Sequence, residues 1–172
     1  MIIELHRLGQ WSRLCKLVSV IVPRIIAEEE VQYYVTSVSF EPKAVAIDLG
    51  EQALQGLFVV EEATTSEIAS VTGELDSITA QGLHPGETEA LAVLRRNADY
   101  VFCTADELAV KALTYLGPPH QGMSLEGLLR SVSLSTKNLA GQFTEECYRG
   151  WTRDARISRV QGLGSAKDLL KR

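Results

Sequence analysis

Three short apolar runs, each followed by a helical pattern, constrain the fold of this chain most. The runs are "VSVIV" (18–22), "LFVV" (57–60) and "DYVFC" (99–103). Their β-branched and aromatic residues predict short buried strands. Strands that alternate with helices are typical of a mostly parallel sheet covered by helices on both faces. The sequence therefore predicts an α/β fold.

Capping and stopping residues mark the helices between these strands. Apolar spacing in "IIELHRLGQWSRLCKLV" predicts two short helices, with Gly9 as the break between them. Serine, threonine and aspartate are typical at helix starts, and glycine is typical at helix ends. The predicted helices span 23–35, 64–82, 86–97 and 106–116, another begins at Ser124, and 39–50 is predicted as a loop with one short element.

The bulk properties favour one ordinary globular domain. The chain has 172 residues and no run of eighteen apolar residues, so we expect no membrane span. The first residues lack the basic region and long apolar stretch of a secretory signal. The three cysteines are widely separated, which fits a reducing cytosol better than a zinc site or a disulfide framework. We therefore expect a cytoplasmic protein with no membrane contact.

Charge is distributed unevenly along the chain. Residues 148–172 hold seven Lys or Arg and two Asp, a charge of +5, so the remainder carries −10 of the total of −5. Arg149, Arg153 and Arg156 are spaced by four and three residues, which places them on one face of a helix. Such a face is a candidate RNA-binding surface or a contact for an acidic partner. A solvated helix face is an equally compatible interpretation.

Acidic residues at the ends of apolar elements are the candidate site. Asp106 follows the third predicted strand, and Glu29 lies on the helix after the first, so a parallel sheet brings both toward one crevice. Glu87 opens the helix at 86–97, where Glu89 competes with it for any role. Carboxylates without His or Cys partners favour Mg²⁺ or Mn²⁺. Taken singly, each acid is better explained as a helix cap or as favourable charge in a first helical turn.

Several motifs resemble the PIN-like domain family. "IIELHRLGQWSRLCKLVSVIVPRIIAEEEV" is similar to its early part, with a helix, a short strand and a Pro-led helix that carries a Glu. "GLHPGETEALAVL" and "ADYVFCTADELAVKAL" are similar to its later part, a Gly-Glu helix followed by a strand and a Thr-x-Asp turn. "HQGMSLEGLL" resembles the Gly-containing strand and helix that come next. The likeness covers roughly 1–130 and leaves 131–172 as a helical, basic C-terminal extension.

The resemblance implies a three-layer α/β fold and a metal-dependent endoribonuclease, often the toxin of a toxin–antitoxin pair. Glu29 and Asp106 then match metal-ligating acids, with Mg²⁺ or Mn²⁺ as the cofactor, and Glu87 assists. The implied partners are an RNA substrate and an antitoxin-like protein. Because an open sheet edge recruits other strands, a homo-oligomer is a further expected state.

Two departures from the family pattern set the alternatives. The family opens with a strand that ends in a metal-ligating Asp, whereas this sequence begins one strand later, at "MIIELHRLG". The frequent Asp-Asp of the turn is Ala105-Asp106. We therefore expect either an enzyme whose longer version is complete or a catalytically degenerate PIN-like protein-binding module. A small-molecule enzyme on a similar sheet has no motif in its favour.

Overall fold

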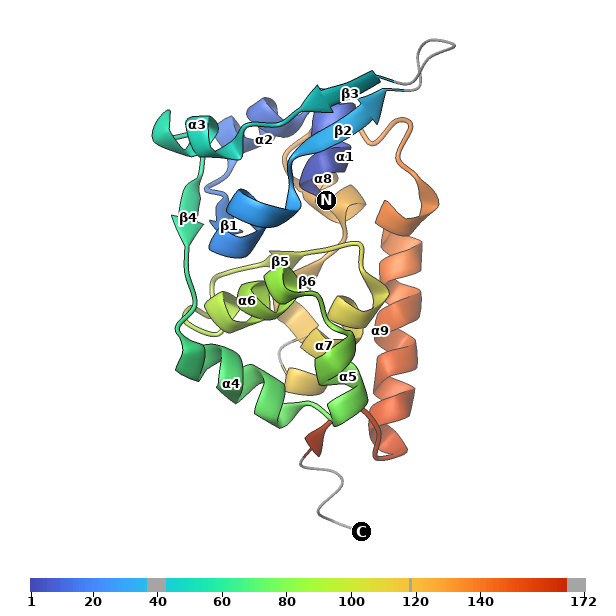
Figure 1. The fold of residues 1–172 in the computed structure, drawn as a ribbon. Helices are drawn as coiled ribbons and strands as arrows, with labels where there is room; N and C mark the ends of the chain where they lie inside the picture. Colours follow the sequence, from blue (N-terminus) through green and yellow to red (C-terminus); the bar gives the residue numbers. More distant parts are fainter. Residues whose placement is uncertain (37–42, 118, 167–172) are drawn as a thin grey trace.

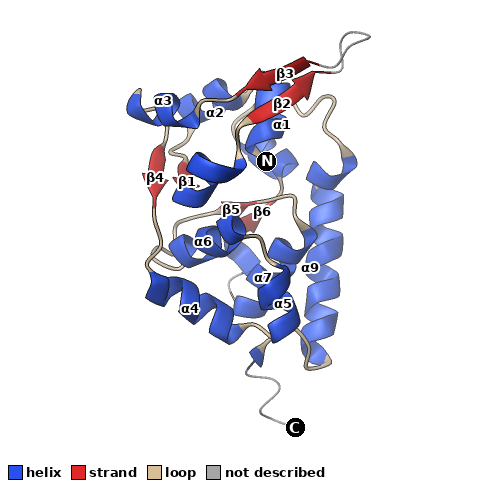
Figure 2. Cartoon of the chain, viewed as in Figure 1, coloured by secondary structure: helices blue, strands red, loops and turns tan. Residues whose placement is uncertain are grey.

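The computed structural model describes residues 1–36, 43–117 and 119–166, and Figure 1 shows their arrangement. Helices predominate, and the strands are short (Figure 2). The elements in chain order are α1 (Ile2–Arg7), α2 (Trp11–Leu17), β1 (Ile21–Pro23), η1 (Ile26–Glu30), β2 (Tyr33–Thr36), β3 (Lys43–Ala46), α3 (Leu49–Leu54), β4 (Val59–Glu61), α4 (Thr65–Glu74), α5 (Ser77–Gly82), α6 (Pro85–Leu94), β5 (Phe102–Cys103), α7 (Glu107–Leu116), η2 (Pro119–Gln121), β6 (Gly122–Met123), α8 (Leu125–Ser131), η3 (Gly141–Phe143) and α9 (Glu145–Val160).

The α/β class predicted from the sequence is confirmed. All three predicted strands are present, but each is only two or three residues long. β1 pairs in parallel with β4, and β5 pairs in parallel with β6. β2 and β3 form an antiparallel pair. Among the described residues the strands therefore form three separate two-stranded sheets instead of the single central sheet that we expected.

Two predicted helices are divided in the structure. In 23–35 the helical part is the five-residue π-helix η1, and Tyr33 begins strand β2, because "YYVT" has high strand propensity and pairs with β3. In 64–82 the chain breaks between α4 and α5. The carboxylate of Asp76 accepts a hydrogen bond from the Thr79 N–H at 2.8 Å and thereby caps a new helix.

The other predicted helices of the domain are confirmed. Gly9 separates α1 from α2 with φ of 64°. Gly117 ends α7 in the left-handed conformation, with φ of 115°. Ser124 caps α8 by accepting the Gly127 N–H at 3.0 Å. The predicted short element within 39–50 is β3, while residues 37–42 lie outside the described part of the chain.

Two apolar cores lie on opposite sides of the strands. The Leu113 core is built mainly by α4, α6 and α7, and the Trp11 core by α1, α2 and α8. Neighbouring strand residues point to different cores, since Ile21 packs on the Leu113 core and Val22 belongs to the Trp11 core. β5 repeats the pattern, with Phe102 on the Leu113 core and Cys103 on the Trp11 core. β1 and β5 thus lie between the two helical cores.

Helix α9 lies along one side of the molecule, next to α7 (Figure 1). Its residues Tyr148 and Ala155 are buried. Within 1–36, 43–117 and 119–166, no helix is both long and apolar enough to cross a membrane.

Candidate functional site

Three acidic side chains from three elements come together where α6 begins and β5 ends. Asp106 follows β5 and caps α7, with its Oδ1 accepting the Ala109 N–H at 2.8 Å. Glu87 lies in the first turn of α6. Glu30 comes from η1, and its Oε1 accepts the Gly86 N–H at 2.9 Å. We call Glu30, Glu87 and Asp106 the acidic cluster.

The electrostatics of the acidic cluster centre on Glu87. Its side chain is half-buried, and burial raises the pKa of its carboxyl group. The charge of Asp106 raises this pKa further, and so does the charge of Glu30. A hydrogen bond from the His84 N–H, at 3.4 Å, acts in the opposite direction. The site therefore favours a proton or a cation beside Glu87.

Gly86 explains why a Gly-Glu pair opens α6. A Cβ atom at this position would lie 2.5 Å from Cγ1 of Ile26 and 2.6 Å from Oε2 of Glu30. Only glycine leaves room for η1 to pack against the start of α6. The close approach lets the Glu30 carboxylate reach the backbone of α6.

Glu29, the acid favoured by the sequence, has a different environment from Glu30. Both residues are exposed, but the Glu30 carboxylate accepts the Gly86 N–H, whereas the bond at Glu29 is made by its backbone carbonyl, which accepts from the Gln32 side chain at 3.4 Å. Asp106 and Glu30 are near enough to Glu87 for their charges to act on its carboxyl group, whereas Glu29, which we expected to share a crevice with Asp106, has no such interaction with Glu87 among the described residues. Sequence reasoning missed Glu30 because the π-helix rotates adjacent acids differently from an α-helix.

Glu89 is a second acid whose role the sequence did not predict. Its side chain is only 1% exposed, and its two oxygens accept the Ile25 N–H at 2.8 Å and the Ala63 N–H at 3.2 Å. These backbone groups follow β1 and β4, respectively. Glu89 therefore holds the carboxyl ends of two parallel strands against α6.

Met1 and Cys103 lie beside the acidic cluster. Burial lowers the pKa of the Met1 amine, and the negative charges of Glu4 and Glu87 oppose this shift. The Sδ atom of Met1 lies 4.0 Å from the Cys103 sulfur. Burial raises the pKa of the Cys103 thiol to about 12, so this cysteine is a neutral, packed side chain.

The donor chemistry of the acidic cluster fits a hard cation. Carboxylate oxygens are the ligands that Mg²⁺ and Mn²⁺ prefer, and Mg²⁺ binds through as few as one or two carboxylates while keeping several waters. In the part of the chain that the structure describes, no group of three His, Cys, Asp or Glu side chains is arranged to hold a metal ion. An ion here would therefore bind to a pair of carboxylates and to water.

The three predicted RNA-binding arginines lie on α9, far along the chain from these acids. Arg149 and Arg153 are exposed, and Arg156 is exposed as well. Arg149 forms an ion pair with Glu145 one turn earlier. Within the described residues Arg153 pairs with its neighbour Asp154, with 3.5 Å between Nε and Oδ1.

No protein-family model, curated protein or solved structure matches this chain, so a likeness to a known family can be argued only from the residues of the chain itself.

Proposed function

We propose that this chain is a PIN-like domain protein and a metal-dependent endoribonuclease, with Glu87 and Asp106 as the cation-binding pair. The observation that carries the proposal is the place of the half-buried Glu87 carboxylate in the first turn of α6, next to the Gly86 N–H that Glu30 accepts; burial and the charges of Asp106 and Glu30 raise its pKa there. Like charges held together in a half-buried position are a recurrent feature of functional sites. A divalent cation would relieve this repulsion, and carboxylate oxygens are among its preferred ligands.

The position of the acidic cluster in the fold supports the same function. β1 and β5 each send neighbouring side chains into the two cores, as expected for the middle layer of a three-layer fold. Asp106 lies just beyond the carboxyl end of β5. In parallel α/β folds this edge is where ligands bind.

The residues of the cluster have separate tasks in the proposed site. Asp106 and Glu87 each keep an oxygen that is not used in capping, and these oxygens would hold Mg²⁺ or Mn²⁺. Glu30 is fixed by Gly86 and adds negative charge nearby. A bound ion of this kind supplies Lewis acidity and lowers the pKa of a water molecule. The proposed substrate is single-stranded RNA.

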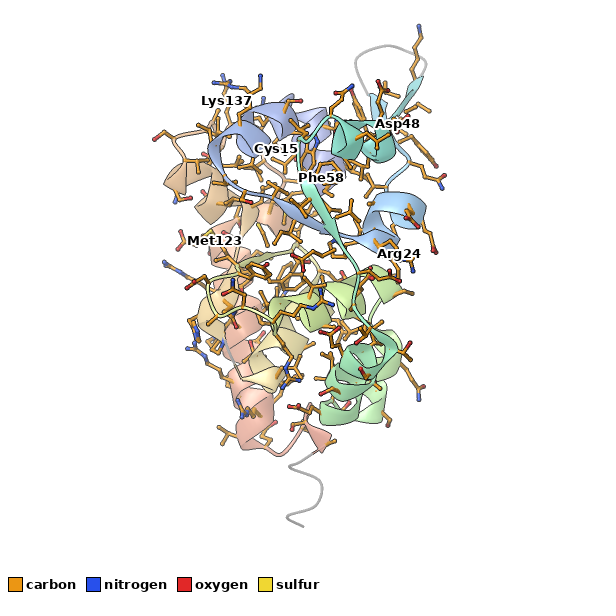
Figure 3. The ribbon with its side chains drawn as sticks, turned by 90° about the vertical axis from the view of Figure 1, so that its left-hand side faces the viewer. Cys15, Arg24, Asp48, Phe58, Met123 and Lys137 are labelled. Atoms are coloured by element: carbon orange, nitrogen blue, oxygen red, sulfur yellow. The ribbon has the colours of Figure 1, made fainter. Side chains whose placement is uncertain are left out.

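The test uses two aspartates that make the same helix-capping hydrogen bond. Asp106 caps α7 and Asp48 caps α3, each accepting a backbone N–H at 2.8 Å. Asparagine caps a helix about as well as aspartate but is a poorer ligand for a hard cation. Asp106→Asn should therefore remove metal binding without unfolding the protein, and Asp48→Asn is the matched control. Figure 3 shows Asp48 near one end of the molecule, at the start of α3.

We expect Mn²⁺ binding in isothermal titration calorimetry and cleavage of a fluorescent single-stranded RNA that EDTA abolishes. Both should be lost in Asp106→Asn and kept in Asp48→Asn. Wild-type protein that neither binds Mn²⁺ nor cleaves RNA would contradict the proposal, and so would full activity in Asp106→Asn.

A further inference from the structure

The outward side of α9 combines arginines with exposed aliphatic residues. The side chains of Tyr148 and Ala155 are buried, so the opposite side of the helix faces solvent (Figure 1). Val160 is 90% exposed, Ile157 is 52% exposed, and Leu163 just beyond the helix is 50% exposed. We call the set Arg149, Arg153, Arg156, Ile157 and Val160 the α9 outer surface, because helical spacing places these residues on one side.

A hollow adjoins the C-terminal half of this surface. Its volume is about 410 Å³, and its lining includes Gly117, Arg156, Arg159 and Val160. Arg159 is held in place there, since its Nη1 donates a hydrogen bond to the Thr114 carbonyl at 3.3 Å. The hollow is large enough to receive one or two side chains of a partner.

The charge of this region is opposite to that of the whole chain. Residues 149–166 contain four arginines and one aspartate, so their charge is +4 − 1 = +3, whereas the chain carries −5. Arg156 forms no ion pair with any described residue, and Arg153 has only its exposed neighbour Asp154. Both guanidinium groups are available to carboxylates of a partner.

We propose that the α9 outer surface binds an acidic, amphipathic helical segment of another protein. Carboxylates of the segment pair with Arg153 and Arg156, and its aliphatic side chains cover Ile157 and Val160, with one side chain in the hollow. This is the helix-on-surface mode of peptide recognition, with complementary charge fixing the orientation.

The aliphatic residues favour a protein over RNA at this position. RNA phosphates pair with arginines but leave a side chain such as Val160 in water, whereas burial of apolar area drives protein association. A second copy of the same surface is disfavoured, because the two arginine rows would face each other.

The test begins with a random library of 16-residue peptides displayed on phage and selected against the full chain. We expect the enriched peptides to carry Asp or Glu together with Leu or Ile at helical spacing. One enriched peptide is then synthesised with a fluorophore, and its Kd is measured by anisotropy. The double variant Arg153→Glu/Arg156→Glu and the single variant Val160→Ser should each weaken binding at least tenfold.

The matched control reverses two cations on another exposed helix face. Arg13→Glu/Lys16→Glu makes the same change in net charge on α2, where both side chains are exposed. This variant should bind the peptide as the wild type does. Circular dichroism should show the same melting temperature for both double variants, because all four side chains lie on the surface.

Three results would overturn the inference. The first is a set of enriched peptides without acidic residues, and the second is a Kd that the α9 variants leave unchanged. The third is tight binding of a 20-nucleotide single-stranded RNA that Arg153→Glu/Arg156→Glu abolishes while Val160→Ser does not. Salt dependence would identify that last case, because phosphate contacts release counterions.

Discussion

Glu87 and Glu89 are two positions apart on α6, and their carboxylates have opposite electrostatic environments. Glu89 is buried and accepts two backbone N–H groups, so its negative charge is compensated by hydrogen bonds. Glu87 is half-buried beside Asp106 and Glu30, so its negative charge is repelled. At the scale of residues, burial alone therefore does not distinguish a structural acid from a functional one, whereas the partners of the carboxylate do.

The first prediction follows from the raised pKa of Glu87. A carboxyl group with a higher pKa in the folded state binds its proton more tightly there than in the unfolded state. The protonated group therefore contributes its full stabilisation below the unfolded pKa of 4.5, and this contribution is lost as pH rises through the folded pKa. Glu87→Gln removes the charge, so we expect its melting temperature at pH 8 to exceed that of the wild type by about 1–3 °C. The difference should shrink toward pH 4.

Differential scanning fluorimetry across pH checks this prediction, with Glu89→Gln as the contrasting variant. An amide side chain has one oxygen and one NH₂ group, so the Ile25 N–H or the Ala63 N–H would face a second donor in place of an acceptor. Glu89→Gln should therefore lower the free energy of unfolding by about 1–3 kcal/mol. Mn²⁺ should raise the melting temperature of the wild type but not that of Glu87→Gln. A Glu87→Gln protein less stable than the wild type at pH 8 would contradict the electrostatic description of the site.

Single residues also mark the limit of prediction from the sequence. The Gly-Glu pair and the Thr-x-Asp turn singled out Glu87 and Asp106, and the charge of Asp106 acts on Glu87 in the structure. Choosing among Glu28, Glu29 and Glu30 required the rotation of η1, and adjacent acids in one short helix carry no sequence signal for that rotation. The one available signal was Gly86, whose missing side chain makes room for Glu30.

At the scale of elements, local capping chemistry was predictable and strand pairing was not. Asp106, Ser124 and Gly117 act at helix ends as their residue types predict. "YYV" (33–35) was included in a helix because its partner strand, β3, lies across a connection and leaves no local pattern. Pairing with β3 therefore determines that this segment is a strand.

The second prediction concerns the contact between β6 and α9. A Cβ atom on Gly122 would lie 1.8 Å from the Tyr148 hydroxyl oxygen and 2.5 Å from Cδ2 of Leu113. Gly122→Ala should therefore destabilise the protein by about 1–3 kcal/mol through overpacking. Adding Tyr148→Phe removes the nearest atom, so the double variant should recover part of the loss, and urea denaturation of the full mutant cycle measures the coupling.

Gly73 provides the matched control for this substitution. It lies on the exposed side of α4, and a Cβ atom there would meet no atom within 4 Å. Gly73→Ala should stabilise the protein by about 0.5–1 kcal/mol through helix propensity. Equal effects of the two glycine substitutions would show that α9 does not pack on β6 as described.

At the scale of the whole molecule, the strands connect two cores that the sequence did not distinguish. The apolar runs predicted buried strands, but not that neighbouring residues such as Ile21 and Val22 enter different cores. Because β1, β4, β5 and β6 each have only two or three residues, side-chain packing and buried hydrogen bonds such as those of Glu89 must hold the two halves together. The cores should consequently unfold as one unit.

The last prediction tests this cooperativity with a cavity in each core. Leu129 in the Trp11 core and Leu113 in the Leu113 core are essentially inaccessible to solvent, so Leu129→Ala and Leu113→Ala should each cost about 2–5 kcal/mol. Trp11 reports on the first core, and Trp151 reports on α9, which packs against α7. Trp11→Phe leaves Trp151 as the one fluorescent tryptophan, and Trp151→Phe leaves Trp11. In each background, and for both cavity variants, the urea midpoint measured by fluorescence should equal the urea midpoint measured by circular dichroism. If Leu129→Ala shifted the Trp11 signal while the Trp151 signal kept its original midpoint, the two halves would be independent folding units, and the links through β1, β5 and Glu89 would be too weak to couple them.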